Sequence, residues 1–270
     1  MTFAVTRRDA ERVARRLFDA GAGAVEERDG PTLVVYVTSR AEARRLSGAA
    51  AVAAVSVREL DPSWQREWMR YLEPVAITDR FVLQPTSSAE KVPRGKRRLW
   101  FEPDQAFGVG SHPTTRLAAR ATEELCRARH PARALDVGTG TGVLAMVAAS
   151  SGAKRVLGID VDPTSVRAAR KNARLNHLTE RCSFSTRPLA KVRSRFDLVL
   201  ANIEAWVLLE LAEDLARVTA PAGRLVLSGL LSERGAEVLG RCSEHALREL
   251  ARAEEDGWLL LVLGRPVVET

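Results

Sequence analysis

The chain has 270 residues, of which 46% are hydrophobic and 28% charged, a composition that excludes disordered, collagen-like and prion-like proteins. Its length suffices for one large domain or two smaller ones. The net charge of +7 suggests nucleic acid, but most of the 41 basic residues are arginines spread along the whole chain, which is equally typical of a compositional bias.

The first 60 residues predict a small α+β module. Apolar residues recur at helical spacing in Arg8–Ala20, and Thr32–Thr38 is rich in β-branched residues. A second helix over Arg40–Leu46 and a strand over Val52–Val57 complete an αβαβ alternation. So few elements bury one face of a sheet most simply as an α+β sandwich.

Residues 61–100 predict a connecting segment. Trp64, Trp68 and Tyr71 lie at spacings of four and three, which is typical of one packed stripe on a helix. Residues 86–98 then carry five basic side chains together with a proline and a glycine. This composition predicts an exposed loop or a hairpin turn.

The remaining residues, 101–270, predict a doubly wound α/β domain. From Arg133 onward short apolar strands alternate with helices, as in a parallel sheet covered on both faces. The expected strands are 134–137, 155–160, 183–186, 196–202 and 223–229, and the expected helices are 116–127, 143–150, 164–176, 205–218 and 232–241. The end of the chain departs from this alternation, because 247–254 and 258–263 flank an Asp-Gly turn and predict an antiparallel hairpin.

A glycine-rich turn, Gly138-Thr-Gly140-Thr-Gly142, follows the first of these strands and opens a helix. Glycines let the backbone approach a ligand closely, and the start of a helix offers unpaired N–H groups. Asp160 ends the next strand, where a carboxylate can accept hydrogen bonds from both hydroxyls of a ribose. The pattern indicates a cofactor that contains a nucleoside.

The spacing of the glycines distinguishes between two such cofactors. The dinucleotide fingerprint is GxGxxG, whereas this turn is GxGxG and has Asp136 two residues before its first glycine. That carboxylate would repel a pyrophosphate but suits the ammonium group of S-adenosylmethionine, which carries no phosphate. We therefore expect S-adenosylmethionine rather than NAD, bound by Asp136, Gly138, Gly140 and Asp160.

Asn202 ends the fourth strand of this domain. The carboxyl ends of strands in an open α/β sheet meet at one crevice, so Asn202 should face the glycine turn. Methyl transfer requires a neutral nucleophile about 3 Å from the methyl carbon. An amide oxygen can accept amine hydrogens and aim the lone pair, although it is no strong base. We expect Asn202 to be the catalytic residue, with ordinary turn chemistry as the alternative.

A long loop, FEPDQAFGVGSHPTT over residues 101–115, precedes the first helix of this domain. Loops of this length in a compact domain are often functional. Thr114 or Thr115 can cap the helix and also reach a cofactor carboxylate. His112 could act as a base or a metal ligand, but it has no second His or Cys nearby, and we expect no metal site.

Several of these segments together resemble one known family, the PrmA methyltransferases, which modify a ribosomal protein of the large subunit. The loop FEPDQAFGVGSHPTT is similar to the family pattern DPGxAFGTGxHPTT. Further segments with this resemblance are LDVGTGTGVLAMVAASSGAKRVLGIDVDP, VLANIEA, LSGLLSERGAEV and the linker SWQREWMRYLEPV. The resemblance covers nearly the whole chain and implies cofactor contacts by Thr115, Gly138, Asp160 and Asn202. We add Phe107 of the signature loop to this set.

The resemblance also implies a separate function for each part of the chain. A ferredoxin-like domain over 1–60 would recognise the protein substrate, and a linker helix and basic loop over 61–100 would be flexible. A Rossmann-like class I methyltransferase domain over 101–270 would methylate lysine ε-amines, the N-terminal α-amine, or both. We further expect a monomer and a weak contact of Lys91–Arg98 with ribosomal RNA.

The cysteine pattern and the apolar runs place the chain in the cytoplasm. Three cysteines without CxxC spacing argue against a disulfide scaffold. The longest apolar run, over residues 258–263, is too short to cross a bilayer, so that no membrane contact is expected.

Three departures from the family pattern leave the substrate open. Glu204 stands where the family has Leu, Val109 stands where it has Thr, and little room remains for a strand before the first helix. A carboxylate at position 204 could attract a cationic lysine or simply begin a helix. Two alternatives therefore remain, namely methylation of another protein's lysines or of a small amine, and a non-catalytic module that binds RNA or the ribosome.

Overall fold

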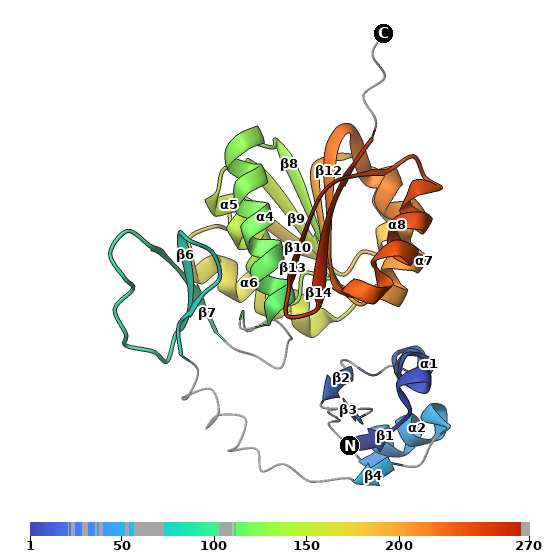
Figure 1. Ribbon diagram of the computed structural model, residues 1–270. Helices are drawn as coiled ribbons and strands as arrows, with labels where there is room; N and C mark the ends of the chain where they lie inside the picture. Colours follow the sequence, from blue (N-terminus) through green and yellow to red (C-terminus); the bar gives the residue numbers. More distant parts are fainter. Residues whose placement is uncertain are drawn as a thin grey trace. The chain divides into compact units, whose positions relative to one another are not determined.

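The computed structural model describes residues 1–20, 22, 25–28, 32–35, 37, 40–51, 54–56, 73–102, 110 and 112–265, some of the first 55 by their backbone alone. The predicted helix with its aromatic stripe over 64–71, and the loop residues Phe107 and Val109, lie outside these ranges. The chain divides into two compact units, Met1–Glu67 and Trp68–Thr270 (Figure 1). The predicted boundaries at residues 60 and 100 stay predictions.

The first unit is an antiparallel sheet combined with two helices. Its elements are β1 (Thr2–Ala4), α1 (Arg7–Asp19), β2 (Val25–Arg28), β3 (Thr32–Val35), α2 (Arg40–Ala50) and β4 (Ala54–Ser56). The strand order β2-β3-β1-β4 is that of a ferredoxin-like fold. Phe3, Val13, Leu17 and Leu33 are buried in its core. The small α+β domain is therefore confirmed.

Two strands of this unit do not show in the sequence pattern. The sequence left little room for a strand before α1, and this expectation is wrong. Three residues suffice for β1, because β3 and β4 pair with it on both sides. Phe3 of β1 is fully buried. β2 has the sequence Val-Glu-Glu-Arg and lies at the edge of the sheet, where charged residues replace the apolar alternation of a central strand.

A second, three-stranded sheet opens the described part of the second unit. β5 (Val75–Ala76) pairs antiparallel with β6 (Phe81–Pro85), which pairs parallel with β7 (Arg97–Phe101). Because β6 and β7 run in the same direction, the basic segment between them is a crossover loop and the predicted alternative of a hairpin turn is wrong. Lys91 and Arg94 of this loop are exposed.

The main sheet of the second unit has seven strands in the order β10-β9-β8-β11-β12-β14-β13. Its strands are β8 (Arg133–Val137), β9 (Arg155–Ile159), β10 (Cys182–Ser185), β11 (Phe196–Asn202), β12 (Thr219–Leu231), β13 (Arg248–Glu255) and β14 (Trp258–Gly264). The first five are parallel, and β14 runs antiparallel to β12 and β13. The predicted doubly wound sheet with a C-terminal antiparallel hairpin is confirmed.

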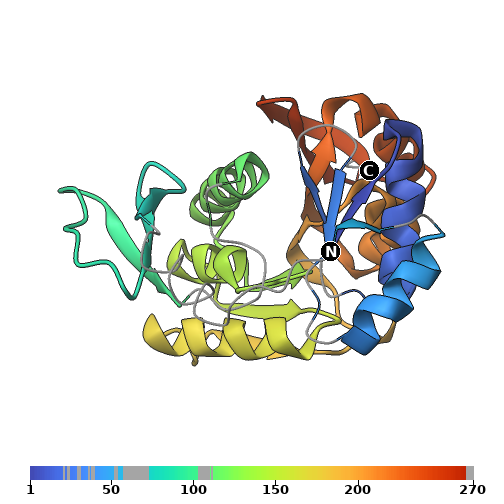
Figure 2. The same cartoon turned by 90° about the horizontal axis from the view of Figure 1, so that it is seen from below.

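Helices cover both faces of this sheet (Figure 2). The helices are α4 (Pro113–Arg129), α5 (Val143–Ser150), α6 (Pro163–Leu175), α7 (Ala205–Val218) and α8 (Gly235–Ser243), with short 3-10 turns at Leu189–Lys191 and Ser232–Arg234. Residues of α4, α5 and α6 share one hydrophobic core, and residues of α7 and α8 share another on the opposite face. Each face of the sheet is therefore closed by its own helical layer.

The order in which the chain adds strands to this sheet reverses at one place, between β8 and β11. The chain steps outward from β8 to β9 and β10, then returns to β11, which lies beside β8 with Val137 opposite Ala201. The loops after β8 and β11 therefore leave neighbouring strands on opposite faces, and ligands of such sheets bind at this point.

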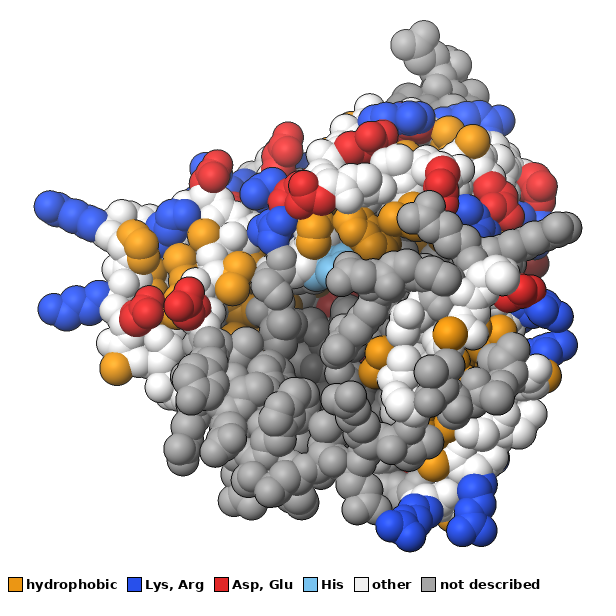
Figure 3. Space-filling model, turned by 60° about the horizontal axis from the view of Figure 1, so that its bottom comes forward, with side chains coloured by type: hydrophobic (Ala, Val, Ile, Leu, Met, Phe, Trp, Pro, Cys, Tyr) orange, Lys and Arg blue, Asp and Glu red, His pale blue; other side chains and the backbone are white. Residues whose placement is uncertain are grey.

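On the face shown in Figure 3, Lys and Arg side chains occur at several separate places, and some of them lie beside Asp and Glu side chains. Two of the five basic side chains predicted to lie in the exposed loop contact their own domain. Arg97 donates to the Ser150 carbonyl at 2.9 Å, and the guanidinium of Arg98 lies 4.3 Å from the centre of the Trp100 ring. Within the described residues we find no helix that could span a membrane.

Candidate functional site

The loop after β8 follows the glycine pattern closely. The N–H groups of Gly138 and Thr139 donate to the Ile159 carbonyl at 2.9 and 3.0 Å, which fastens the loop to the end of β9. Gly138 has a φ of +69°, and a Cβ there would lie 2.3 Å from Cγ2 of Ile203. Only glycine therefore lets the loop after β8 approach the loop after β11 this closely.

Asp160 follows β9 and binds the same loop from the other side. Its Oδ2 accepts from the Gly140 N–H at 2.9 Å and its Oδ1 from the Asp162 N–H at 3.0 Å. Burial is the largest cause of the raised pKa of this carboxyl group. Because each carboxylate oxygen has two lone pairs, both remain able to accept a ligand hydroxyl.

Val161 was not among the predicted site residues. The residue is 87% exposed, although it directly follows the half-buried Asp160. If Asp160 binds the ribose of a nucleoside, the exposed apolar side chain next to it can pack against the flat face of the nucleoside's base. The only sequence signal was its position next to the acid.

Asp136 is the fourth residue of β8, just before the loop, and has 1% of its surface exposed. Its Oδ2 accepts from the Thr139 hydroxyl at 2.6 Å and from the Ala145 N–H at 3.1 Å. Burial raises the pKa of Asp136 to about 7, and the charge of Asp160 adds to the rise, although both hydrogen bonds oppose it. This carboxylate therefore braces the loop, and its predicted contact with an ammonium group stays a prediction.

Asn202 ends β11 opposite Ser228 of β12, and the following N–H, of Ile203, donates to the Ser228 carbonyl at 3.2 Å. The amide oxygen of Asn202 is buried and has no hydrogen-bond partner among the described residues. A buried acceptor without a partner is costly and is uncommon outside functional sites. This oxygen is therefore available to a ligand that brings N–H groups.

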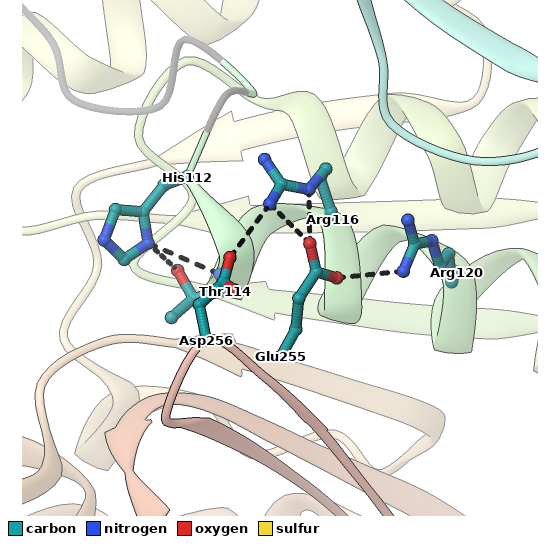
Figure 4. Close-up of polar contacts among 6 residues, drawn as sticks. All are labelled: His112, Thr114, Arg116, Arg120, Glu255 and Asp256. Atoms are coloured by element: carbon teal, nitrogen blue, oxygen red, sulfur yellow. Dashed lines mark hydrogen bonds and ion pairs between the residues drawn. The ribbon is translucent and has the colours of Figure 1, made fainter.

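The start of α4 differs from the prediction, because His112 rather than a threonine caps the helix. Its Nδ1 lies 3.3 Å from the Thr114 N–H and 2.8 Å from the Thr114 hydroxyl (Figure 4). Burial and, to a smaller extent, the charge of Arg116 lower the pKa of His112, which favours the neutral imidazole with Nδ1 as acceptor. The helix thus begins at Pro113, three residues before the predicted start.

The first turn of α4 lies against the strand next to Asn202. Thr114 and Thr115 are both buried, and the Ser228 hydroxyl donates to the Thr114 carbonyl at 3.2 Å. Ser228 thereby connects the turn that carries Thr115 to the strand end that carries Asn202. Among the described residues, no group of three His, Cys, Asp or Glu side chains could hold a metal ion.

The structure brings most of the predicted residues to one edge of the sheet. Asp136, Gly138, Gly140, Asp160 and Asn202 lie at or after the carboxyl ends of β8, β9 and β11. Such an arrangement can bind a nucleoside at one end and offer an amide oxygen to an amine at the other.

The comparisons with known proteins agree with this arrangement. The family model described as "Ribosomal protein L11 methyltransferase (PrmA)" matches residues 32–266. A protein of Geotalea daltonii named ribosomal protein L11 methyltransferase is 40% identical over 209 residues, covering 74% of this chain and 67% of that protein. A protein of Sorangium cellulosum with the same name is 36% identical over 251 residues, covering 86% and 79%.

Solved structures show the same likeness. A ribosomal protein L11 methylase from Lactobacillus delbrueckii subsp. bulgaricus superposes with a TM-score of 0.66 at 28% identity, covering 72% of this chain and 99% of that one. A putative RNA methyltransferase from Pyrococcus horikoshii, with a TM-score of 0.51 at 17% identity, shares the fold alone.

Proposed function

This chain belongs to the PrmA family of ribosomal protein L11 methyltransferases, and on this premise we propose that it transfers methyl groups from S-adenosylmethionine to amino groups of ribosomal protein L11. The acceptors are lysine ε-amines, the N-terminal α-amine, or both. The observation that carries the proposal is that the buried Asn202 amide oxygen, beside the glycine loop, has no hydrogen-bond partner within the described part of the chain. A ribosomal substrate would also place the reaction in the cytoplasm.

The residues present fit S-adenosylmethionine. Two carboxyl groups whose pKa values are raised mainly by burial, Asp136 and Asp160, lie at one loop, where a bound cation would favour their charged forms. Asp160 would bind the ribose hydroxyls, Val161 would cover the base, and the buried Thr115 at the start of α4 would receive the carboxylate. When bound, the cofactor supplies a methyl carbon activated by its sulfonium.

Asn202 would position the acceptor. Its Oδ1 accepts an N–H of the neutral amine, which turns the nitrogen lone pair away from Asn202 and toward the methyl carbon. The amide neither gains nor loses a proton, so the amine has to lose its proton to solvent before transfer. Gly138 keeps the loop close enough to Ile203 for cofactor and amine to meet.

Labelling tests the proposed function. The protein is incubated with S-adenosylmethionine labelled in its methyl group and with ribosomal proteins from the same source, and the label is located by mass spectrometry. We expect label on amino groups of L11. Label on another protein or on a small amine would contradict the substrate and keep the enzyme class, whereas no label together with no cofactor binding would contradict both.

Asp160→Ala should weaken S-adenosylmethionine binding by about 1.5–3 kcal/mol, roughly 10- to 150-fold, because two hydrogen bonds to a charged acceptor are lost. Calorimetry on the purified variant measures the dissociation constant. Asp160→Asn keeps one acceptor oxygen, and its affinity for S-adenosylmethionine should lie between those of Asp160→Ala and the wild type. A wild-type affinity in Asp160→Ala would contradict the assignment of the ribose.

Cofactor binding should weaken about 10-fold between pH 7 and pH 5.5. The pKa of Asp136 in the free protein is about 7, so a falling pH protonates the carboxyl group that the ammonium requires. The measurements are kept below pH 7.5, because above this pH the α-amino group of the cofactor begins to lose its own proton. Asp136→Asn keeps the acceptor for Thr139 and should bind weakly with a flat pH profile. If the affinity of this variant fell with pH as steeply as that of the wild type, the titrating group would be one other than Asp136.

Glu204→Leu should raise the KM for L11 several-fold and leave the affinity for S-adenosylmethionine unchanged. Glu204 lies two residues after Asn202, where its Oε2 accepts from the Trp206 indole N–H at 2.7 Å. A carboxylate held at this point would attract a protonated lysine before it is deprotonated. Glu213→Leu on the exposed side of α7 is the matched control. If both variants have the same KM, Glu204 only begins the helix.

The other parts of the chain have secondary roles in this proposal. The ferredoxin-like unit recognises the protein substrate, and Lys91–Arg98 makes a weak contact with ribosomal RNA. The whole protein acts as a monomer in this proposal. We assign the contact with RNA to the exposed Lys91 and Arg94, because Arg97 and Arg98, although also exposed, contact Ser150 and Trp100 of their own domain. Tight RNA binding with a steep salt dependence, combined with no cofactor binding, would instead favour a non-catalytic RNA-binding module.

A further inference from the structure

The tip of the C-terminal hairpin contacts the start of α4 at two places, and Figure 4 shows the first of them, around Glu255. On one side Glu255, the last residue of β13, binds two arginines of α4. Its Oε1 accepts from Nε of Arg116 at 2.7 Å and also contacts Nη2 of Arg116, and its Oε2 accepts from Arg120 at 2.9 Å. Asp256 in the turn adds a longer contact of 3.8 Å to Arg116.

On the other side, Trp258 at the start of β14 meets the helix cap. The ring centres of Trp258 and His112 are 4.8 Å apart, and the rings are inclined by 70°, which is an edge-to-face contact. His112 in turn accepts from the Thr114 N–H. The hairpin therefore contacts both the cap and the first turn, on either side of Thr115.

These contacts can restrain α4 more strongly than an ordinary surface ion pair could. Glu255 has 21% of its side chain exposed and Arg116 has 22%, so solvent screens the pair only in part. One carboxylate binds both arginines, and residues 116 and 255 are far apart in the sequence, so the contact joins two separate elements. Such a pair restrains the helix relative to the hairpin, which a pair within one element cannot do.

We propose that the hairpin tip clamps the first turn of α4, and that Glu255 is a positioning residue for binding of the cofactor carboxylate. The inference rests on the proposed function, because it needs Thr115 and the start of α4 to receive that carboxylate. Without Glu255 the two arginines lose their common partner, the first turn gains freedom, and the cofactor has to restore its order on binding. The effect is expected on the affinity for the cofactor and not on the affinity for the protein substrate.

The same strand offers a matched control. Glu249 of β13 has 23% of its side chain exposed and binds Arg252, whose exposure of 54% equals that of Arg120. Its arginine partner lies three residues away on the same strand, so this pair joins no second element. Glu249→Ala removes an equally exposed carboxylate and an equally close partner without touching α4.

The test measures Glu255→Ala, Glu255→Gln and Glu249→Ala as full-length proteins. We expect Glu255→Ala to raise the KM and the dissociation constant for S-adenosylmethionine about 10-fold, with kcat and the KM for L11 within about two-fold of the wild type. Glu255→Gln, which keeps the shape and the acceptor oxygen, should recover part of the affinity, and Glu249→Ala should equal the wild type. A merely structural role would lower the active fraction and leave the KM for the cofactor unchanged, which would overturn the proposal.

Hydrogen exchange of the free proteins separates the clamp from the proposed function. The amides of residues 115–117 should exchange about 10-fold faster in Glu255→Ala than in Glu249→Ala. If the wild type fails to bind S-adenosylmethionine, the proposed function is wrong while the exchange result still decides whether the clamp exists. Equal exchange and equal cofactor affinity in these two variants would show that the hairpin tip restrains nothing.

Discussion

Asn202→Ala is expected to lower kcat for methylation of L11 about 100-fold, while S-adenosylmethionine binding weakens far less. The amide oxygen is the group that would hold the amine in line with the methyl carbon, and loss of such alignment costs on the order of 100-fold in rate. Single-turnover methylation with saturating cofactor measures the effect without product release. Asn202→Asp keeps an acceptor oxygen at the same place and should retain more activity than the alanine variant.

The stability of the same variant should change in the opposite direction. The Asn202 oxygen is buried without a partner among the described residues, and such a group costs about 1–3 kcal/mol in the folded state. Asn202→Ala removes this cost and should have an unchanged or raised melting temperature. A loss of activity together with a loss of stability would indicate that the amide holds the strand end rather than the amine.

Much of the catalytic domain could be predicted because its signals are local. Most strands of the parallel sheet contain a short apolar run, and the turn after β8 needs glycine for its positive φ angles. The position of Asn202 beside this turn followed from a general property of open α/β sheets, since residues after the carboxyl ends of neighbouring strands share one crevice.

The errors occurred where a contact with a distant residue decides the structure. β1 is too short to show a pattern and depends on pairing with β3 and β4. The direction of β7 is set by its pairing with β6 and by Asn176 of the α6 end, whose Oδ1 accepts from the Trp100 N–H at 2.8 Å. His112 is a rare cap in place of the expected threonine, and its contact with Trp258 spans more than half of the chain.

Gly229→Ala is expected to lower the free energy of unfolding by more than about 3 kcal/mol. Gly229 has a φ of +83°, and a left-handed conformation costs an L-residue roughly 1–2 kcal/mol by itself. An added Cβ would also lie 2.4 Å from the Ile203 carbonyl oxygen and 2.9 Å from the Ile203 nitrogen. These are backbone atoms, so no side-chain rotation can relieve the overlap.

The control for this variant is Gly240→Ala in helix α8. A Cβ at Gly240 would meet no atom within 4 Å, and the residue is exposed. Alanine is there expected to raise the free energy of unfolding by roughly 0.5–1 kcal/mol, because glycine is unfavourable inside a helix. Urea denaturation of both variants compares the same substitution in the two environments.

The position of Gly229 gives its replacement a consequence for activity as well. Ile203 lies between two glycines, since a Cβ on Gly138 would meet its side chain and a Cβ on Gly229 would meet its backbone. Pushing Ile203 away from Gly229 therefore moves it toward the cofactor loop and displaces the adjacent Asn202. The surviving folded fraction of Gly229→Ala should accordingly show a reduced kcat. If its unfolding midpoint and kcat both equalled those of Gly240→Ala, the close approach of β12 to the loop after β11 would have no role in placing Asn202.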